Sequence, residues 1–175
     1  MIRLTGGQAR GRVLREPVPR GVRPTSSRVR EALFSMVGQD LRETTFLDAF
    51  GGAGVVGLEA WSRGARVVVV EQQPEVARAI VRRGEEVAAE WTVRTGDVLR
   101  LAPQLGVFEG VFVDPPYAVD PAEVLPSLAP LATGWLILEA HASREDVPAP
   151  PGMVLDRVRR YGKRALWVFT PTDSS

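Results

Sequence analysis

The sequence predicts a doubly wound α/β domain with a mostly parallel β-sheet, and three observations carry that prediction. The order strand, turn, helix repeats along most of the chain from Thr45 onward. Two segments, 66–71 and 110–114, are apolar on both faces, as buried parallel strands are. The first strand is followed by GAGVVG at 52–57, a G-x-G-x-x-G turn. Repeated strand–helix units of this kind build a parallel sheet with helices on both faces.

The chain length of 175 residues suits one domain, and the composition narrows what that domain can do. The chain has no cysteine, which excludes disulfides and thiolate metal sites, and its single histidine, His141, disfavours a histidine metal site or a Ser-His-Asp triad. No apolar run approaches about 18 residues, and no signal-peptide pattern opens the chain. We therefore expect a cytoplasmic monomer with no metal and no membrane association.

Positive charge is concentrated at the amino-terminal end of the chain. The formal net charge is +1, but residues 1–30 hold eight arginines and a single acid, Glu16. The rest of the chain holds 14 basic and 20 acidic side chains. A basic arm on an acidic body is typical of a protein that meets a polyanion at one end, although a solvated arginine-rich leader gives the same pattern.

The amino-terminal segment is too rich in glycine and proline for a helix, but residues 2–4 and 13–14 are apolar enough to pair as short strands. A Thr-Ser-Ser run then offers an N-cap for a helix over 26–37, whose apolar residues fall mostly on one face. We therefore predict that a basic arm or hairpin, residues 1–25, precedes one domain, residues 26–175.

Each later element follows from its apolar pattern and its flanking residues. Pro74 suits the first turn of a helix, and Gly162 suits a hairpin turn between the last two strands. The expected strands are 46–50, 66–71, 91–95, 110–114, 135–139, 153–161 and 163–170. The expected helices are 54–63, 74–89 and 121–131. The sum is a mostly parallel sheet that ends in a hairpin.

Ligands of such sheets bind beyond the carboxyl ends of the strands, so the loops there are the candidate site. Glu71 follows Gly52 by 19 residues, the spacing of the acid that binds a ribose hydroxyl in dinucleotide sites, so NAD is one candidate ligand. Asp48, four residues before Gly52, disfavours NAD. A carboxylate at the mouth of the turn repels a pyrophosphate and suits a cation, such as the ammonium group of S-adenosylmethionine (SAM). The same carboxylate could instead cap a helix or brace the loop.

The loop after the fourth large strand, Asp114-Pro115-Pro116-Tyr117, has a specific chemical use. The exocyclic amine of a base is a poor nucleophile, because its lone pair is delocalised into the ring. The carboxylate of Asp114 and the carbonyl of Pro115 can accept hydrogen bonds from the N–H groups of this amine and so aim its lone pair at a methyl donor. The fixed φ of the two prolines holds the carbonyl in place. Tyr117 offers a face for an unstacked base, worth about 1–3 kcal/mol. The alternative is a proline-rich strand exit with a surface tyrosine.

Two sets of motifs resemble known proteins. LDAFGGAG at 47–54 with DPPY at 114–117 resembles the SAM-dependent methyltransferases of exocyclic amines, and GGQARGRVL at 6–14 with GVRPTSSRVREALF at 21–34 resembles one group of them, the RsmD family. The resemblance implies a Rossmann-like SAM-dependent methyltransferase fold, with a seven-stranded, mostly parallel sheet whose last strand is antiparallel. It also implies methyl transfer to the N2 amine of a guanine in bacterial 16S ribosomal RNA, so the small ribosomal subunit is the expected partner.

The resemblance assigns residues to three groups. The cofactor-binding group places Glu71 on the ribose hydroxyls and Asp97 near the adenine amine, and it comprises Asp48, Phe50, Gly52, Gly54, Glu71, Gln72, Asp97 and Val98. The catalytic group comprises Asp114, Pro115, Pro116 and Tyr117. The RNA-binding group comprises Arg10, Arg12, Arg20, Arg23, Thr25, Arg28 and Arg30. The sequence departs from the family's pattern at Ala53, where a serine is frequent, at Ala9, where an aromatic residue is common, and around Arg83, where an asparagine is usual.

Two other functions share these features. A DNA adenine N6-methyltransferase uses the same DPPY loop, but the chain is short for one and has no evident target-recognition domain. A non-catalytic RNA-binding protein on a methyltransferase fold would keep the basic arm, but intact Asp48, Glu71 and DPPY disfavour a degenerate site. We therefore expect a SAM-dependent ribosomal RNA (guanine-N2)-methyltransferase.

Overall fold

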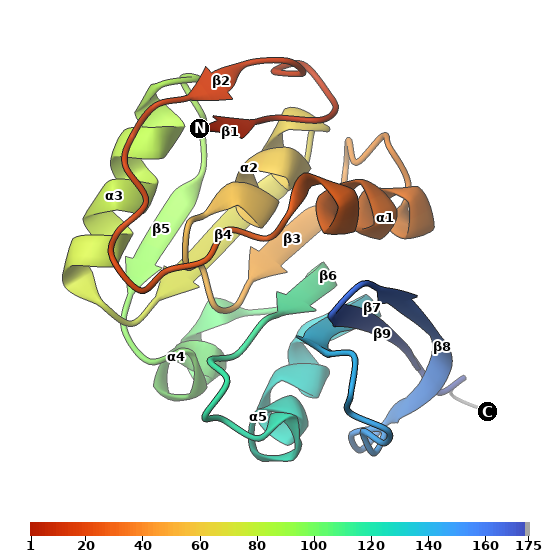
Figure 1. Cartoon of the computed structure of the whole chain (residues 1–175). Helices are drawn as coiled ribbons and strands as arrows, with labels where there is room; N and C mark the ends of the chain where they lie inside the picture. The colour runs from red at the N-terminus through yellow and green to blue at the C-terminus, as the bar shows by residue number, and fades with distance from the viewer. Residues whose placement is uncertain (174–175) are drawn as a thin grey trace. The chain divides into compact units, whose positions relative to one another are not determined.

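The computed structural model of the protein describes residues 1–173, which fall into two compact units. The first unit is Met1–Val98, and the second begins at Leu99. Figure 1 shows the helices and strands of both units. No helix within residues 1–173 is long and apolar enough to cross a membrane.

The first unit is built on three parallel strands in the order β5-β4-β3, namely Thr92–Thr95, Arg66–Glu71 and Thr45–Asp48. Two helices follow these strands, α2 (Val55–Ser62) after β3 and α3 (Pro74–Glu85) after β4. Alternating strands and helices bring the carboxyl ends of β3, β4 and β5 to one edge, where the turns after them lie side by side.

The amino-terminal segment packs onto these helices. Strands β1 (Ile2–Arg3) and β2 (Val13–Leu14) pair antiparallel, as predicted, and helix α1 (Ser27–Val37) begins after an N-cap at Ser26. In Figure 1 the red segment between β2 and α1 runs beside α3. The apolar residues Ile2, Leu4 and Leu14 form one buried cluster with Leu58 of α2, so the segment belongs to the packed interior of the first unit.

The second unit contains four strands in the order β6-β7-β9-β8. Strands β6 (Phe108–Val113) and β7 (Ala132–His141) are parallel, whereas β9 (Arg164–Pro171) lies antiparallel to both β7 and β8 (Met153–Tyr161). Helix α5 (Pro121–Leu128) and the short 3-10 helix η1 (Ala129–Leu131) connect β6 to β7. Gly162, at φ 59°, makes the predicted hairpin turn between β8 and β9.

The predicted strand content is confirmed, because the three strands of the first unit and the four of the second give seven long strands within residues 1–173, with the last one antiparallel. Helix α3 is shorter than the predicted 74–89. It ends at Glu85, and a turn follows in which Ala88 takes a left-handed φ of 53° and the Ala89 amide donates to the Gly84 carbonyl at 2.9 Å. Helix α4 (Val98–Leu105) was not predicted, because it is only eight residues long and contains Pro103.

Candidate active site

The Gly turn after β3 needs glycine at two positions for different reasons. Gly52 and Gly54 have φ values of 56° and 76°, in the left-handed region that favours glycine. A Cβ on Gly54 would lie 2.9 Å from Cγ2 of Ile80 in α3, so packing also demands glycine there. A Cβ on Gly52 would meet nothing nearer than Cγ1 of Val22, at 3.8 Å. The backbone at Gly52 therefore has room beside it for a ligand to approach.

Glu71, at the end of β4, fixes the turn. Its Oε2 accepts a hydrogen bond from the Gly52 amide at 2.9 Å, and its Oε1 accepts one from the Gln73 amide at 2.9 Å. A carboxylate has about four lone-pair sites, so both oxygens retain capacity to accept from a vicinal diol. The acid predicted to bind the ribose is thus directly bonded to the Gly turn, and its orientation is set by the backbone.

Asp48, the last residue of β3, caps the helix that follows the turn. It is 1% exposed, and its Oδ2 accepts a hydrogen bond from the Gly57 amide at 3.2 Å. Gly57 is the third residue of α2, whose N-cap residue, Gly54, supplies no side chain. The carboxylate therefore already compensates the positive end of α2, where a dinucleotide site would receive its phosphates. This arrangement disfavours the pyrophosphate of NAD at the turn.

The other predicted cofactor residues surround the same edge of the first unit. Phe50 and Asp97 are half-buried and Gln72 is exposed. The Gly96 amide donates to the Glu71 carbonyl at 2.9 Å, which holds the loop after β5 against the loop after β4. Val98 is 3% exposed, so its side chain belongs to the core and only its backbone is available to a ligand.

Arg83 of α3 also supports the turn, a role that the sequence analysis missed. Its side chain is fully buried, with Nη1 donating to the Ala53 carbonyl at 2.6 Å and Nη2 donating to the carbonyls of Glu16 and Pro17, each at 3.0 Å. Burial lowers the pKa of this guanidinium. One side chain thus ties the Gly turn to the amino-terminal segment. Its position three residues after the buried Ile80, on the apolar face of α3, was a signal that could have identified it.

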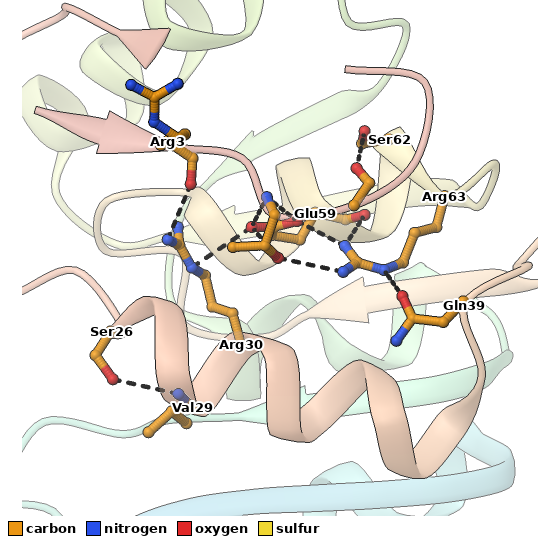
Figure 2. Close-up of polar contacts among 10 residues, drawn as sticks. Arg3, Ser26, Val29, Arg30, Gln39, Glu59, Ser62 and Arg63 are labelled. Carbon is orange, nitrogen blue, oxygen red and sulfur yellow. Dashed lines mark hydrogen bonds and ion pairs between the residues drawn. The ribbon is translucent and has the colours of Figure 1, made fainter. Parts of the chain in front are cut away.

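Glu59 of α2 is a second charged residue that the sequence analysis missed, and Figure 2 shows it at the centre of a polar network. Its side chain is 0% exposed and pairs with two buried arginines, Arg30 at 3.5 Å and Arg63 at 2.6 Å. The Thr5 amide donates to Oε1 of Glu59 at 2.9 Å. The network therefore joins the amino-terminal segment to α1 and α2. An acid within the otherwise apolar α2 was the signal for it.

The predicted RNA-binding residues divide into an exposed set and two that are less accessible. The arginines with exposed side chains are Arg10, Arg12, Arg20, Arg23 and Arg28, whereas Thr25 is half-buried. Arg30 is 3% exposed, and its Nη2 donates to the Arg3 carbonyl at 3.1 Å. Burial lowers the pKa of Arg30, with Glu59 opposing that effect. Arg30 serves the protein interior, which corrects its assignment to the RNA-binding group.

The DPPY loop lies in the second unit, directly after β6. Tyr117 is 95% exposed, so its ring face is open to a planar ligand. The Val119 amide donates to the Pro116 carbonyl at 2.9 Å, which closes the turn. Within residues 1–173 no donor is bonded to the Pro115 carbonyl, so that carbonyl is available as an acceptor.

Asp114 sits beside one cation and one further acid. Nη2 of Arg164 lies 3.1 Å from Oδ1 of Asp114, and Nε of the same guanidinium lies 3.0 Å from Oε1 of Glu139. Burial and then the neighbouring Glu139 raise the pKa of Asp114 to about 8, with Arg164 opposing them. The sequence analysis identified Asp114 but neither of its partners, which come from β7 and β9.

The described part of the chain holds no group of three or more His, Cys, Asp or Glu side chains able to bind a metal ion. Two surface hollows are lined instead by residues at other positions, such as Trp61 and Trp91 in one with a volume of about 500 Å³. Neither hollow includes the predicted cofactor or catalytic residues.

Comparison with known proteins gives one family. The family model described as conserved hypothetical protein 95 matches residues 2–170. Ribosomal RNA small subunit methyltransferase D of Escherichia coli (strain K12) is 36% identical over 142 residues, which are 79% of this chain and 71% of the relative. The putative rRNA methyltransferase YlbH of Bacillus subtilis (strain 168) is 27% identical over 180 residues, which cover 96% of this chain and 98% of the relative.

Solved structures agree with these relatives. The putative methyltransferase yhhF from Escherichia coli superposes with a TM-score of 0.85 and 30% identity, covering 99% of each chain. A hypothetical protein of Thermus thermophilus superposes with a TM-score of 0.84 and 33% identity, covering 96% of this chain and 98% of that one. More distant methyltransferases, including TrmN from Thermus thermophilus with a TM-score of 0.71 and 18% identity, share the fold. The predicted methyltransferase fold is therefore confirmed.

Proposed function

We propose a function from one premise, namely that the chain belongs to the RsmD family, whose model is the one described as conserved hypothetical protein 95. The proposed reaction is transfer of a methyl group from SAM to the N2 amine of a guanine in 16S ribosomal RNA. The observation that carries the proposal is the DPPY loop after a buried strand, with Tyr117 95% exposed, in a chain whose curated relatives are named ribosomal RNA methyltransferases.

The Gly turn fits SAM better than it fits a dinucleotide. SAM carries a ribose diol, a carboxylate and two positive charges, on its sulfonium and ammonium groups, and no phosphate. Glu71 would accept from the ribose hydroxyls, and Asp97 would contact the adenine amine. The acidic turn, with Asp48 already at the amino terminus of α2, favours a cation over a pyrophosphate. The space beside Gly52 would let the cofactor approach the backbone of the turn.

SAM supplies an electrophilic methyl group, and the DPPY loop would supply the orientation of the nucleophile. Asp114 and the Pro115 carbonyl would accept the two N–H groups of the guanine N2 amine, which directs its lone pair. Pro116 would keep the loop rigid through its fixed φ and its hydrogen-bonded carbonyl. Tyr117 would stack on a base that has left the RNA helix.

The exposed arginines of the predicted RNA-binding group would contact RNA phosphates, namely Arg10, Arg12, Arg20, Arg23 and Arg28. Phosphate contacts supply most of the sequence-independent affinity for a nucleic acid, and arginine suits them because its guanidinium binds phosphate through two donors. The substrate would be the small ribosomal subunit or its RNA, and the protein would act in the cytoplasm. We expect it to act as a monomer, with Thr25 near the RNA.

The relatives do not favour the alternatives. A DNA adenine methyltransferase would share the DPPY loop, but the curated relatives that match this chain are named for ribosomal RNA. A non-catalytic RNA-binding protein would not need the bond between Glu71 and Gly52 or the open acceptor at Pro115.

The proposal is tested by transfer of radiolabelled methyl groups from SAM to small ribosomal subunits that lack the modification. Asp114→Ala is expected to abolish transfer while SAM affinity stays within a few-fold, because Asp114 would act on the amine. Asp146→Ala, a change at an exposed aspartate of the same unit, is the matched control and should transfer normally. Loss of SAM binding in Asp114→Ala would refute the role given to this residue.

A further inference from the structure

Asp114 shares a guanidinium with a second carboxylate. Arg164, the first residue of β9, reaches Glu139 of β7 through Nε at 3.0 Å and Asp114 through Nη2 at 3.1 Å. The Glu139 side chain is 4% exposed, whereas those of Asp114 and Arg164 are 27% and 37% exposed. The three side chains therefore form a chain of contacts that runs from the interior of the second unit to the DPPY loop.

The planar guanidinium makes this contact directional. Its N–H groups point in fixed directions within one plane, so a carboxylate that it binds is held in orientation and not only in position. Glu139 is anchored in β7, where it pairs in register with Leu166 of β9. Arg164 thus transmits the fixed position of a buried strand residue to Asp114, which lies in a loop.

We infer that Glu139 and Arg164 are a positioning pair, which orients the carboxyl group of Asp114 and controls when it is ionised. The inference rests on the methyl transfer proposed above. As the bond from N2 to the methyl carbon forms and the carbon–sulfur bond breaks, N2 becomes positively charged and must release one proton. An ionised Asp114 can accept that proton and pass it to water, so its protonation state matters to the rate.

The two partners act on Asp114 in opposite directions. Glu139 shares the Arg164 guanidinium with Asp114, and its charge opposes ionisation of Asp114. Arg164 favours ionisation. These are the charged groups that face Asp114 from β7 and β9. His141, the register partner of Arg164, is exposed and bonds to Ser143 at 2.7 Å.

The test is the pH dependence of methyl transfer at saturating SAM, in wild type and in two variants. Glu139→Gln removes the like charge, so the acid limb of the profile should move to lower pH by about one unit or more. Arg164→Gln removes the cation, so the acid limb should move to higher pH by about one unit or more. SAM affinity and the KM for RNA should change less than about twofold in both variants, because neither residue is placed on either substrate.

Two further variants separate positioning from mere folding. Arg164→Lys restores the positive charge but not the planar guanidinium. Its acid limb should therefore return toward the wild-type pH, while its kcat should be lower than that of wild type. Arg157→Gln is the matched control, because Arg157 lies on β8, is 41% exposed and is paired with Asp156 at 2.7 Å. It should leave both the profile and kcat unchanged. Shifts in the same direction for Glu139→Gln and Arg164→Gln, or no shift in either, would overturn the inference.

A second measurement does not depend on methyl transfer. Carboxyl carbon NMR of ¹³C-labelled aspartate, with Asp114→Asn identifying the signal, reports the titration of Asp114 directly in each variant. Opposite displacements of that titration would support the pair even if wild type transferred no methyl group, an outcome that would refute only the proposed function. An unmoved titration would refute the pair even in an active enzyme.

Discussion

Oε2 of Glu71 accepts a hydrogen bond from the backbone amide of Gly52 at 2.9 Å, across 19 residues of sequence. This contact links the end of β4 to the turn after β3. It shows that the acid of the Gly-turn fingerprint braces the turn directly, beside the open space at Gly52. Removing it should therefore affect the turn and the ligand together.

Replacing Glu71 tests its role in cofactor binding. Glu71→Ala removes hydrogen bonds to a charged acceptor, each worth about 1.5–3 kcal/mol. We expect SAM affinity, measured by isothermal titration calorimetry, to fall about tenfold to 100-fold. Glu75→Ala, a change at an exposed acid in the first turn of α3, should bind SAM normally. Unchanged affinity in Glu71→Ala would mean that the cofactor lies elsewhere.

The two left-handed glycines should respond differently to alanine. Both substitutions place a side chain at positive φ, which costs about 1–2 kcal/mol. Gly54→Ala also drives a Cβ to 2.9 Å from Ile80, and such overpacking adds about 1–3 kcal/mol. Urea unfolding should thus rank Gly54→Ala below Gly52→Ala in stability.

The loss of SAM affinity in these two variants should not follow their loss of stability. Gly52→Ala places its Cβ in the space assigned to the cofactor, so it should lose more SAM affinity than its modest destabilisation explains. If Gly52→Ala bound SAM as wild type does, that space would not be the cofactor's.

The buried network around Glu59 should contribute strongly to the stability of the first unit. Glu59→Ala leaves Arg30 and Arg63 buried without their shared acid, and breaking a buried ion pair from one side costs about 3–5 kcal/mol. Urea unfolding measures the loss. Glu85→Ala, a change at an exposed glutamate at the end of α3, should cost about 0.5 kcal/mol or less. Equal effects of the two substitutions would contradict the structural role of the network.

The arm arginines should determine how RNA binding depends on salt. Replacing Arg10, Arg20 and Arg23 with Gln should reduce the slope of log affinity against log salt concentration by about 2, at roughly 0.7 per phosphate contact. The control replaces three exposed arginines outside the arm, Arg42, Arg66 and Arg78, and should leave the slope unchanged. Equal slopes for the two triple variants would remove the arm from the RNA contact.

Much of this fold could be predicted from local pattern. The apolar runs of β4 and β6 and the turn at Gly162 are recognisable in the sequence, because buried parallel strands and tight hairpins need particular residues. Helix α4 could not be predicted, since an eight-residue segment with a proline has weak intrinsic helicity and forms through tertiary packing. The end of α3 is followed by a turn with Ala88 at a left-handed φ of 53°, a conformation that an alanine in a helical pattern does not signal.

The candidate site likewise contains residues that could be predicted from the sequence and residues that could not. Glu71 and Gly52 were predicted to belong to one cofactor site, because their spacing reflects a recurring geometry of strand, turn and strand, but the hydrogen bond between them was not predicted. Arg83, Glu139 and Arg164 were missed, because a charged residue is expected to be solvent-exposed until its buried partner is known. Arg30 was misassigned for that reason, since an arginine-rich segment gives no sign of which arginine faces Glu59.

The central claim is tested most directly by nucleoside mass spectrometry. Purified protein is incubated with SAM and small ribosomal subunits that lack the modification, and the digested RNA is scanned for every methylated base. The account predicts a stoichiometric gain of N2-methylguanosine, absent with Asp114→Ala. A gain of methyladenine, or no gain on subunits and on protein-free ribosomal RNA, would contradict it.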